Sequence, residues 1–348
     1  MAAIPGGRLA LCLQSMRWAG AGLLLAVVVL APGATAGDEP VTLRVGTIAP
    51  EGSPYYDAAV SVGRTITKNT KGAVRLRIYP AAAMGDEAQL MGSVHSGQLE
   101  VYVGSAVAAF AQLPELAVFE LPYLFSNEAE VDATFVKVWP QTRKALAARS
   151  YEGIGYSAVG FRHLWTKRPI GSLDDLRKLR IRSMPAPTYE RFWKLAGVPA
   201  VAIGVPEVAP LLEQGALDGF EQAITFTFAS SWHQYVKHLA LTAHIFQPGV
   251  ALIGPQGRAR LPKGAAATML AGVEVDIKES LRRVREVDRG LLASLPGVGV
   301  AVAPPPPELV RDLKAHAATV RAEWRKTAPP AGKKLYDTIE KLLAAARG

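Results

Sequence analysis

The fold of this chain is decided by three stretches in its second half: GFRHLWTKRPIGSLDDLRKLRIRS at 160–183, VPEVAPLLEQGALDGFEQ at 205–222 and LTAHIFQPGVALI at 241–253. Ser172 and Asp175 resemble a helix capping box, and 179–182 alternates apolar and basic residues with the period of a strand. Helices are predicted over 187–195 and 206–214, because each begins near proline and ends before glycine. Short helices between short strands predict an α/β lobe.

The first half of the chain predicts a second lobe of the same class. Its pattern alternates strands and helices, which are expected at 41–48, 54–71, 74–78, 86–96 and 99–103. Nearer the C-terminus, 273–292 and 309–324 each place apolar residues along one face, which predicts two long amphipathic helices. The prolines at 304–307 form a rigid connector between them.

The N-terminus has the features of an export signal. An apolar run at 19–31 follows two arginines and ends at a small-residue site, 34–36, so we expect cleavage that removes 1–36. The run is shorter than the roughly 20 residues that a membrane-spanning helix needs. Translation starts at either Met1 or Met16. The remaining length is more than one hydrophobic core usually serves, which again favours two lobes.

Composition argues against several classes of function. The formal net charge of +9 suits an anionic ligand, but the basic residues are spread along the chain without a nucleic-acid-binding module. The only cysteine, Cys12, lies in the expected signal. His233 and His238 are five residues apart, which does not suit a shared metal ion. The common hydrolase, phosphate-binding and dinucleotide-binding motifs are missing, so we expect no catalytic residue, no metal and no cofactor.

Two arginines are the best candidates for contact with a ligand. A guanidinium can hold a carboxylate through two parallel hydrogen bonds. Strand alternation puts Arg180 and Arg182 on the same face and does not choose between them. Arg182 ends the predicted strand, and in open α/β sheets ligands bind beyond the carboxyl ends of strands. A single arginine such as Arg182 or Arg162 is nevertheless more often solvated or paired structurally.

Eight short motifs then follow one another along the chain: YP at 79–80, MGDE at 84–87, SGQLE at 96–100, ELAVFELPYLF at 115–125, GFR at 160–162, LRIR at 179–182, GALDGFEQ at 215–222 and LTAH at 241–244. In this order and spacing, from Val41 to about Tyr336, they resemble the solute-binding proteins of tripartite ATP-independent periplasmic (TRAP) transporters, the DctP-like family. The resemblance implies an α/β, type II-like periplasmic binding protein with a ligand cleft between two lobes and long C-terminal helices. The expected lobes are 37–159 plus about 248–287, and 160–247 plus about 288–348.

The resemblance also implies residue roles. Arg182 matches the arginine that binds the ligand carboxylate, and Arg162 matches one that often assists. Gln222 stands where the family usually has asparagine, and it keeps an amide but reaches one methylene further. Glu87 and Ser105 match positions that sometimes contact polar parts of the ligand, and Ser105 argues against a sugar acid because sialic-acid binders are often acidic there.

Other positions depart from the family or are ambiguous. Ala223 replaces the usual proline, and Val205 and Ala209 replace aromatic residues of many relatives, which favours a bulkier or more apolar acid. Phe220 is expected to line the cleft. Trp232 and Tyr156 could do so as well, although buried aromatic residues more often fill cores. His244 is expected to be structural.

The implied function is that of a periplasmic receptor. It would bind a small organic acid and deliver it to the small and large integral membrane subunits of a TRAP transporter for ion-gradient-driven uptake. The alternative is a periplasmic sensory receptor that presents the bound acid to a signalling partner. An exported enzyme of the same fold class is a third reading. The residues leave the identity of the acid and the oligomeric state open.

Overall fold

The computed structural model describes residues 39–348. The predicted export signal at 1–36, which includes Cys12, lies outside the described residues. Within 39–348, none of the helices combines the length and the apolar character needed to cross a bilayer.

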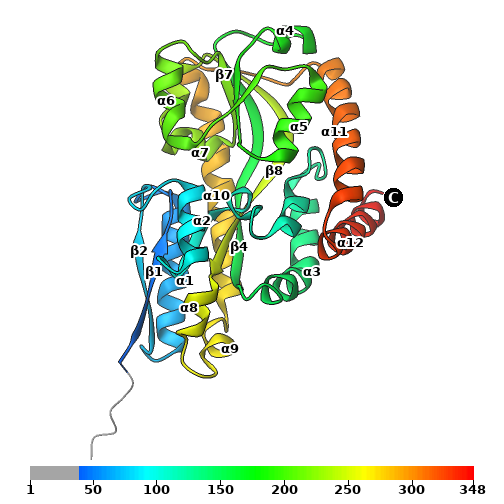
Figure 1. Cartoon of the computed structure of the whole chain (residues 1–348). Coiled ribbons are helices and arrows are strands. Elements are labelled where there is room, and N and C mark those ends of the chain that lie inside the picture. The colour runs from blue at the N-terminus through cyan, green and yellow to red at the C-terminus, as the bar shows by residue number, and fades with distance from the viewer. Residues whose placement is uncertain (1–38) are drawn as a thin grey trace, which may run out of the picture. The chain divides into compact units, whose positions relative to one another are not determined.

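A single mixed sheet of nine strands runs through the described residues, in the order β2-β1-β3-β8-β4-β7-β5-β6, with β9 paired to β8 (Figure 1). Four predicted strands are confirmed as β1, β2, β3 and β5, with small shifts of their ends. The strands are β1 (Val41–Gly46), β2 (Val74–Tyr79), β3 (Val101–Ser105), β4 (Glu152–Thr166), β5 (Ile181–Ser183), β6 (Ala200–Ala202), β7 (Gly219–Gln222), β8 (His238–Ile253) and β9 (Ala301–Ala303).

The strands β4 and β8 are the longest and form an antiparallel pair in the middle of the sheet. Their pairing extends from Glu152 opposite Ile253 to Thr166 opposite His238. The register shifts at three places, one of them at Gly160, whose φ is +125°. One end of the pair joins β3 and the other end joins β7. Both strands therefore connect the two ends of the sheet.

The helices predicted from the sequence are present, and α3 and α12 are two further long helices that the sequence analysis did not predict. The side chain of Ser53 caps α1, and Asp86 with Gln89 forms a capping box at α2. The helices predicted over 273–292 and 309–324 are confirmed as α10 and α11. The α-helices are α1 (Pro54–Asn69), α2 (Glu87–Ser96), α3 (Glu128–Ala147), α4 (Leu173–Arg177), α5 (Pro187–Ala196), α6 (Val205–Glu213), α7 (Ile224–Ala229), α8 (Pro255–Ala259), α9 (Ala265–Met269), α10 (Val273–Ser294), α11 (Pro307–Thr327) and α12 (Pro330–Arg347), and the 3₁₀ helices are η1 (Ala106–Ala109), η2 (Pro114–Glu120), η3 (Trp232–Tyr235) and η4 (Leu295–Val298).

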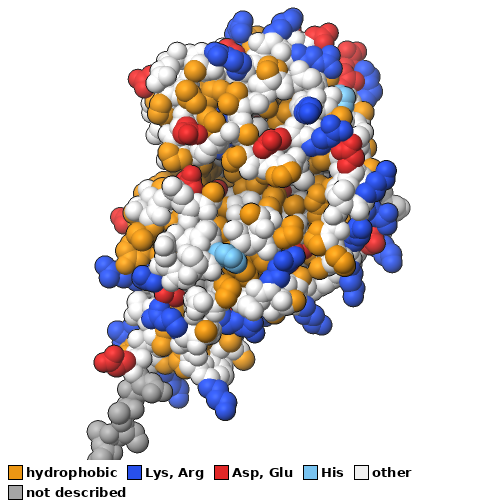
Figure 2. All heavy atoms as spheres, viewed as in Figure 1, with side chains coloured by type: hydrophobic (Ala, Val, Ile, Leu, Met, Phe, Trp, Pro, Cys, Tyr) orange, Lys and Arg blue, Asp and Glu red, His pale blue; other side chains and the backbone are white. Residues whose placement is uncertain are grey.

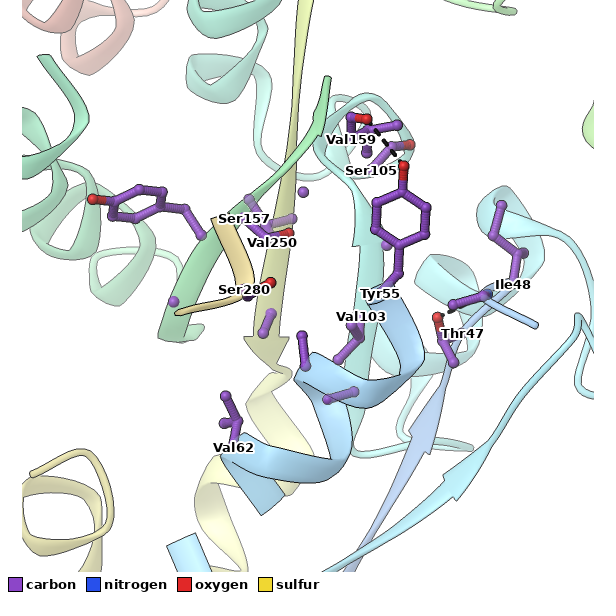
Figure 3. A pocket seen from close by; sticks show the side chains of 18 of the residues that line it. Thr47, Ile48, Tyr55, Val62, Val103, Ser105, Ser157, Val159, Val250 and Ser280 are labelled. Atoms are coloured by element: carbon purple, nitrogen blue, oxygen red, sulfur yellow. Dashed lines mark hydrogen bonds between the residues drawn. The ribbon is translucent and has the colours of Figure 1, made fainter. Parts of the chain in front are cut away.

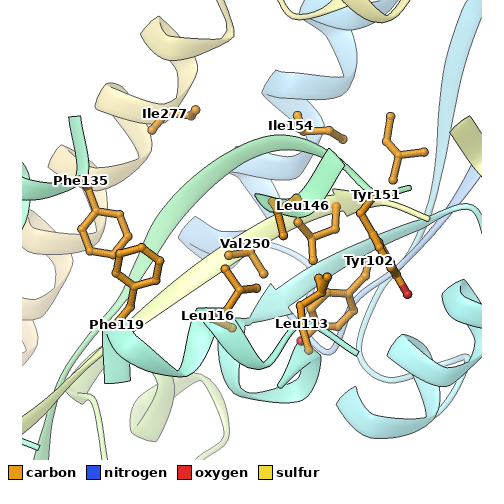
Figure 4. Close-up of a cluster of buried hydrophobic side chains, with 14 of the residues drawn as sticks. Tyr102, Leu113, Leu116, Phe119, Phe135, Leu146, Tyr151, Ile154, Val250 and Ile277 are labelled. Carbon is orange, nitrogen blue, oxygen red and sulfur yellow. The ribbon is translucent and has the colours of Figure 1, made fainter. Parts of the chain in front are cut away.

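Separate hydrophobic clusters define two lobes. The first lobe packs around a cluster from β1, β3, η2 and α3, in which the rings of Phe119 and Phe135 lie 4.7 Å apart (Figure 4). The second lobe packs around two clusters, one under α5 and α11 and the other under α6 and η3. In Figure 1, β4, β8 and α10 run between them. This is the two-lobe α/β fold with long C-terminal helices that the sequence predicted.

The C-terminal helices do not all belong to one lobe. Leu309 and Leu313 of α11 pack in the second lobe, whereas Leu335, Ile339 and Leu343 of α12 pack in the first. The sequence assigned all of 288–348 to the second lobe, so α12 differs from that assignment. The reason is that the apolar face of α12 meets α3 and η2, a tertiary contact that periodicity within the helix cannot reveal.

Candidate functional site

Arg182 on β5 is completely buried, and only part of its guanidinium has a partner. Its Nε and Nη2 donate to the carbonyl oxygen of Ile203 at 3.1 and 2.8 Å. Its Nη1 is buried and has no hydrogen-bond partner among residues 39–348. The guanidinium carbon also lies 5.5 Å from the centroid of the Trp232 ring. The side chain is thus held in place and keeps one nitrogen available for an acceptor.

Arg182 is one of the residues that line a cavity of about 320 Å³, which we call the arginine cavity. Its other walls come from the first lobe, at the start of α2 and at η1, and from the second lobe, around Met184 and Val205. Both lobes therefore contribute to it. Figure 2 shows the surface hollowed between the lobes, with hydrophobic side chains in the hollow.

Among residues 39–348, no counter-ion is bonded to the charge of Arg182. Burial, with a smaller contribution from Arg162, lowers the pKa of Arg182 to about 9. Glu221 and Glu87 oppose this shift through space, but within the described chain no carboxylate forms a salt bridge with Arg182. The guanidinium is still protonated at neutral pH. A carboxylate in the arginine cavity would supply the missing negative charge.

Arg162, in contrast, is fully engaged with the protein. Its Nε donates to Glu221 at 3.1 Å, and its Nη2 donates to the backbone carbonyl of the same residue at 2.5 Å. Its Nη1 donates to Gln222 at 2.9 Å and to Gln247 at 2.6 Å. All three guanidinium nitrogens thus hold β7 and β8 against β4. Direct contact between Arg162 and a ligand stays a prediction.

Glu221 is the acidic centre of this network, and sequence reasoning missed it. Besides Arg162, its carboxylate accepts hydrogen bonds from Ser183 at 2.6 Å and from His244 Nε2 at 2.8 Å. Burial opposes its ionisation, but the charge of Arg162 and the bond from His244 outweigh burial and hold the pKa of Glu221 well below its usual range. Burial lowers the pKa of His244, which stays neutral and donates to Glu221. His244 is thus buried within this network, and its structural role stays a prediction.

Glu87 and Ser105 form a tightly bonded pair in the first lobe. Ser105 donates to Glu87 from its backbone nitrogen at 2.7 Å and from its hydroxyl at 2.8 Å. The hydroxyl of Tyr102 donates to the same carboxylate at 3.0 Å. Burial nevertheless raises the pKa of Glu87. Glu87 and Arg182 both line the arginine cavity.

Gln222 and Phe220 have different surroundings although both lie on β7. The side-chain oxygen of Gln222 accepts from Arg162 and from the backbone nitrogen of Ala223, each at 2.9 Å, so its NH₂ group is the part left to donate. Phe220 is completely buried, with its ring centroid 5.9 Å from that of Trp165 and 5.3 Å from that of Trp232. Phe220 therefore lies in the core and supports the tryptophan under Arg182.

A further buried acid, Glu120 of η2, was also missed. The hydroxyl of Tyr189 donates to one of its oxygens, and the other oxygen has no partner among the described residues. Burial raises the pKa of Glu120 to about 8. Glu120 is therefore mostly protonated at neutral pH. Its place in the ELPYLF motif gave no sign of burial, because the residues around it have no clear period.

A second cavity, of about 100 Å³ (Figure 3), shares wall residues with the arginine cavity. Glu87, Met184 and Val205 line both cavities, and Ser105 and Gln222 line the second. The two cavities thus bring together four of the predicted site residues, Arg182, Glu87, Ser105 and Gln222. Arg162 lies behind Gln222, and Phe220 lies in the core.

Comparisons with known proteins agree with this architecture. A solute-binding protein of Verminephrobacter eiseniae is 25% identical over 263 residues, which are 75% of this chain and 78% of that protein. A TRAP periplasmic solute-binding protein of Polaromonas sp. JS666, solved with D-erythronate, has a TM-score of 0.78 and 23% identity and covers 86% of this chain and 98% of its own. A sugar acid-binding protein of Advenella mimigardefordensis, solved with galactonate, has a TM-score of 0.79 and 23% identity over 87% of this chain and 99% of its own.

The family model of the bacterial extracellular solute-binding proteins, family 7 (DctP), matches residues 45–327. This match spans both lobes and contains every predicted site residue. The chain therefore belongs to the DctP family, the family that its motifs resembled.

Proposed function

We propose that this chain is an exported receptor that binds a small organic acid through Arg182 and delivers it to the membrane subunits of a TRAP transporter. The ligand carboxylate accepts from Nη1 of Arg182 in the arginine cavity. Glu87 and the amide of Gln222 contact polar groups elsewhere on the ligand. Uptake is driven by an ion gradient across the membrane, and the receptor works in the periplasm.

One observation carries this proposal: a buried arginine has a nitrogen without a partner among residues 39–348 and lines a cavity between two lobes. Buried polar groups in folded proteins are almost always hydrogen-bonded, and buried charges are almost always paired. An arginine that departs from both rules at a cavity is best explained by a partner that arrives from solution. A carboxylate matches the guanidinium in charge and in planar geometry.

The relatives support the same class of ligand. The Polaromonas protein was solved with D-erythronate and the Advenella protein with galactonate, and both compounds are carboxylates. A curated relative from Vibrio cholerae, 23% identical over 66% of this chain, is a sialic acid-binding periplasmic protein. Sialic acid is also a carboxylate. The feature that these ligands share is the one that Arg182 can recognise.

Domain closure would complete the site. The arginine cavity has walls from both lobes, so a hinge motion that brings the lobes together removes a bound carboxylate from water. Desolvation strengthens the interaction between the two charges. We expect the closed, liganded form to be the one that the membrane subunits recognise.

The binding step is tested by calorimetric titration of wild type and Arg182→Ala with a panel of carboxylates. Loss of one partner of a buried charge pair typically costs about 2–5 kcal/mol, so we expect the dissociation constant to rise roughly thirty-fold to several thousand-fold. Arg180→Ala is the matched control, since Arg180 precedes the same strand but is exposed and bonded to the backbone at Gly215. Equal affinities for wild type and Arg182→Ala would disprove the assignment.

The delivery step needs a separate measurement. Vesicles that carry the small and large membrane subunits should accumulate labelled acid only when the receptor and an ion gradient are both present. Accumulation without the receptor, or no accumulation despite tight binding, would contradict the transport role and leave the sensory role as the explanation of binding.

A further inference from the structure

We propose that the preferred ligand is a carboxylate with an apolar tail, and that the tail occupies the second cavity, which we call the tail chamber. This inference rests on the proposed function, because Arg182 holds the carboxylate in the arginine cavity. The two cavities share Glu87, Met184 and Val205 as wall residues, so a ligand can extend from one into the other. Because of the tail chamber, the site should prefer amphiphilic acids to compact polar ones.

The walls of the tail chamber follow the periods of the elements that form them. On β3, the alternate residues Val101, Val103 and Ser105 all line it, which is the period of one face of a strand. On α10, Ile277 and Ser280 lie close to one turn apart and also line it. Figure 3 shows the chamber between this face of the sheet and the helices α1 and α10. Most of its wall residues belong to the first lobe, and Met184, Val205, Gln222 and Phe226 come from the second.

Small side chains keep this space open. Residues Ala58 and Ala59 of α1, Ser157 of β4, Ala251 of β8 and Ser280 of α10 line the chamber. Protein cores are normally packed without voids much larger than a water molecule. A volume of about 100 Å³ is well above the roughly 10–15 Å³ that one water molecule requires. The chamber is therefore large enough to receive part of a ligand.

The polar groups in the walls are mostly turned to protein partners. The hydroxyl of Tyr55 donates to the carbonyl of Val159 at 3.1 Å, and the carboxylate of Asp276 accepts from Ser61 at 2.6 Å. The hydroxyl of Ser280 is buried without a partner among the described residues. The surface that remains for a ligand is therefore mainly apolar, which disfavours a sugar acid with a hydroxyl on each carbon.

The position of the chamber also fits an extended ligand. From Ser105, next to Glu87, to Val101 is four residues of strand, or about 13 Å at roughly 3.3 Å per residue. Glu87 lines both cavities and is hydrogen-bonded to Ser105, while the apolar residues Val62 and Leu76 line only the tail chamber. A ligand whose charged head lies beside Arg182 could therefore extend an apolar tail past Glu87 into the tail chamber.

The test is a series of straight-chain monocarboxylates from acetate to octanoate, titrated into the full-length mature protein. Each methylene group that enters an apolar chamber should lower the dissociation constant about fourfold, until the chamber is full. A matched series of hydroxylated acids of the same length should lose this gain. Measurable binding with a dissociation constant that does not change with chain length would overturn the inference and leave the proposed function intact.

Two variants of Ser280 test whether the apolar tail of the ligand binds in the tail chamber. Ser280→Leu fills part of the chamber and should remove the gain for longer acids while the affinity for acetate and propionate stays the same. Ser280→Ala removes the same hydroxyl without adding volume, so it should keep the full chain-length dependence. If both variants keep the gain, the tail binds elsewhere and the inference is wrong.

The proposed function fails in a different way. If no acid of the series binds to wild type, or if Arg182→Ala binds all of them as well as wild type does, the carboxylate assignment itself is wrong, and the tail chamber falls with it. Should Ser280→Leu not fold, as judged by circular dichroism, the chain-length series on wild type alone decides the question.

Discussion

The guanidinium of Arg182 lies over the indole ring of Trp232, 5.5 Å from its centroid. Trp232 is held in turn by edge-on contacts with Phe220 and Phe226, at centroid distances of 5.3 and 5.8 Å. An aromatic face attracts a cation, and more strongly when both are out of water. The aromatic cluster of the second lobe therefore fixes the direction in which Arg182 points.

Replacing Trp232 should weaken ligand binding without touching the ligand. We expect Trp232→Leu to raise the dissociation constant of a carboxylate about two- to thirty-fold, since the cation–π contact is lost, and Trp232→Phe to have a smaller effect. Trp193→Leu is the control, because Trp193 is as deeply buried but belongs to the cluster under α5 and α11. Titration calorimetry measures the affinities. Equal losses in the Trp232→Leu and Trp193→Leu proteins would indicate a general effect of core damage.

The pair formed by Arg162 and Glu221 should contribute chiefly to stability. Arg162→Met leaves the Glu221 carboxylate buried without its cation, which typically costs about 3–5 kcal/mol of unfolding free energy. The double variant Arg162→Met with Glu221→Gln should recover part of this loss, because no buried charge is left unpaired. Urea unfolding measures all three proteins.

An exposed pair is the control for that experiment. Arg282 binds Glu279 and Glu286 on the surface of α10, so Arg282→Met should change the midpoint of urea unfolding very little. A loss for Arg162→Met as small as that for Arg282→Met would contradict the structural role assigned to Arg162.

Glu120 should make the protein less stable as the pH rises. Burial raises the pKa of Glu120 to about 8, so the folded state binds this proton more tightly than the unfolded state does. The unfolding free energy should then fall between roughly pH 4.5 and pH 8, by about 1.4 kcal/mol per unit for a single group of this kind. Glu120→Gln cannot ionise, so its advantage over wild type should grow across this range and level off above it. Parallel slopes for the two proteins would show that Glu120 titrates normally.

The glycine at the irregularity of β4 should resist substitution. The φ of Gly160 is +125°, and a Cβ there would lie 3.2 Å from the side chain of Ala223 and 3.3 Å from that of Asp288. We expect Gly160→Ala to cost about 1–3 kcal/mol. A Cβ added to Gly290 in α10 would meet nothing beyond its own helix within 4 Å, so Gly290→Ala should stabilise by about 0.5–1 kcal/mol. Thermal unfolding of the two variants should therefore shift in opposite directions.

The parts of the fold that could be predicted are those with local signals. The strand that carries Arg182 alternates over 179–182, and the two helices that follow it begin at or next to a proline and end just before a glycine, so the strand and both helices could be predicted. The strands β4 and β8 could not be predicted from the sequence. Their register irregularities break the alternation of apolar and polar residues, and long parts of both strands are buried on both faces.

The partners of the site residues depend on contacts between distant segments. Arg162 meets Glu221, Gln222 and Gln247 only through the pairing of β4 with β7 and β8, which no spacing within the sequence fixes. The tail chamber was equally hidden, since Ala59 and Ser280 become neighbours of one space only when α1 and α10 lie on the same face of the sheet. The loss of aromatic residues at Val205 and Ala209 pointed towards a more apolar ligand but not to its location.

The two long strands that pass between the lobes set a mechanical condition on the receptor. Because β4 and β8 are bonded to each other along most of their length, neither can swing alone, and any opening has to flex both as one ribbon. Bending such a ribbon costs free energy, and this free energy is recovered when the ribbon returns to its resting shape. The resting angle between the lobes thus depends on the shape of this ribbon, and α10, which also runs between the lobes, has to bend with it.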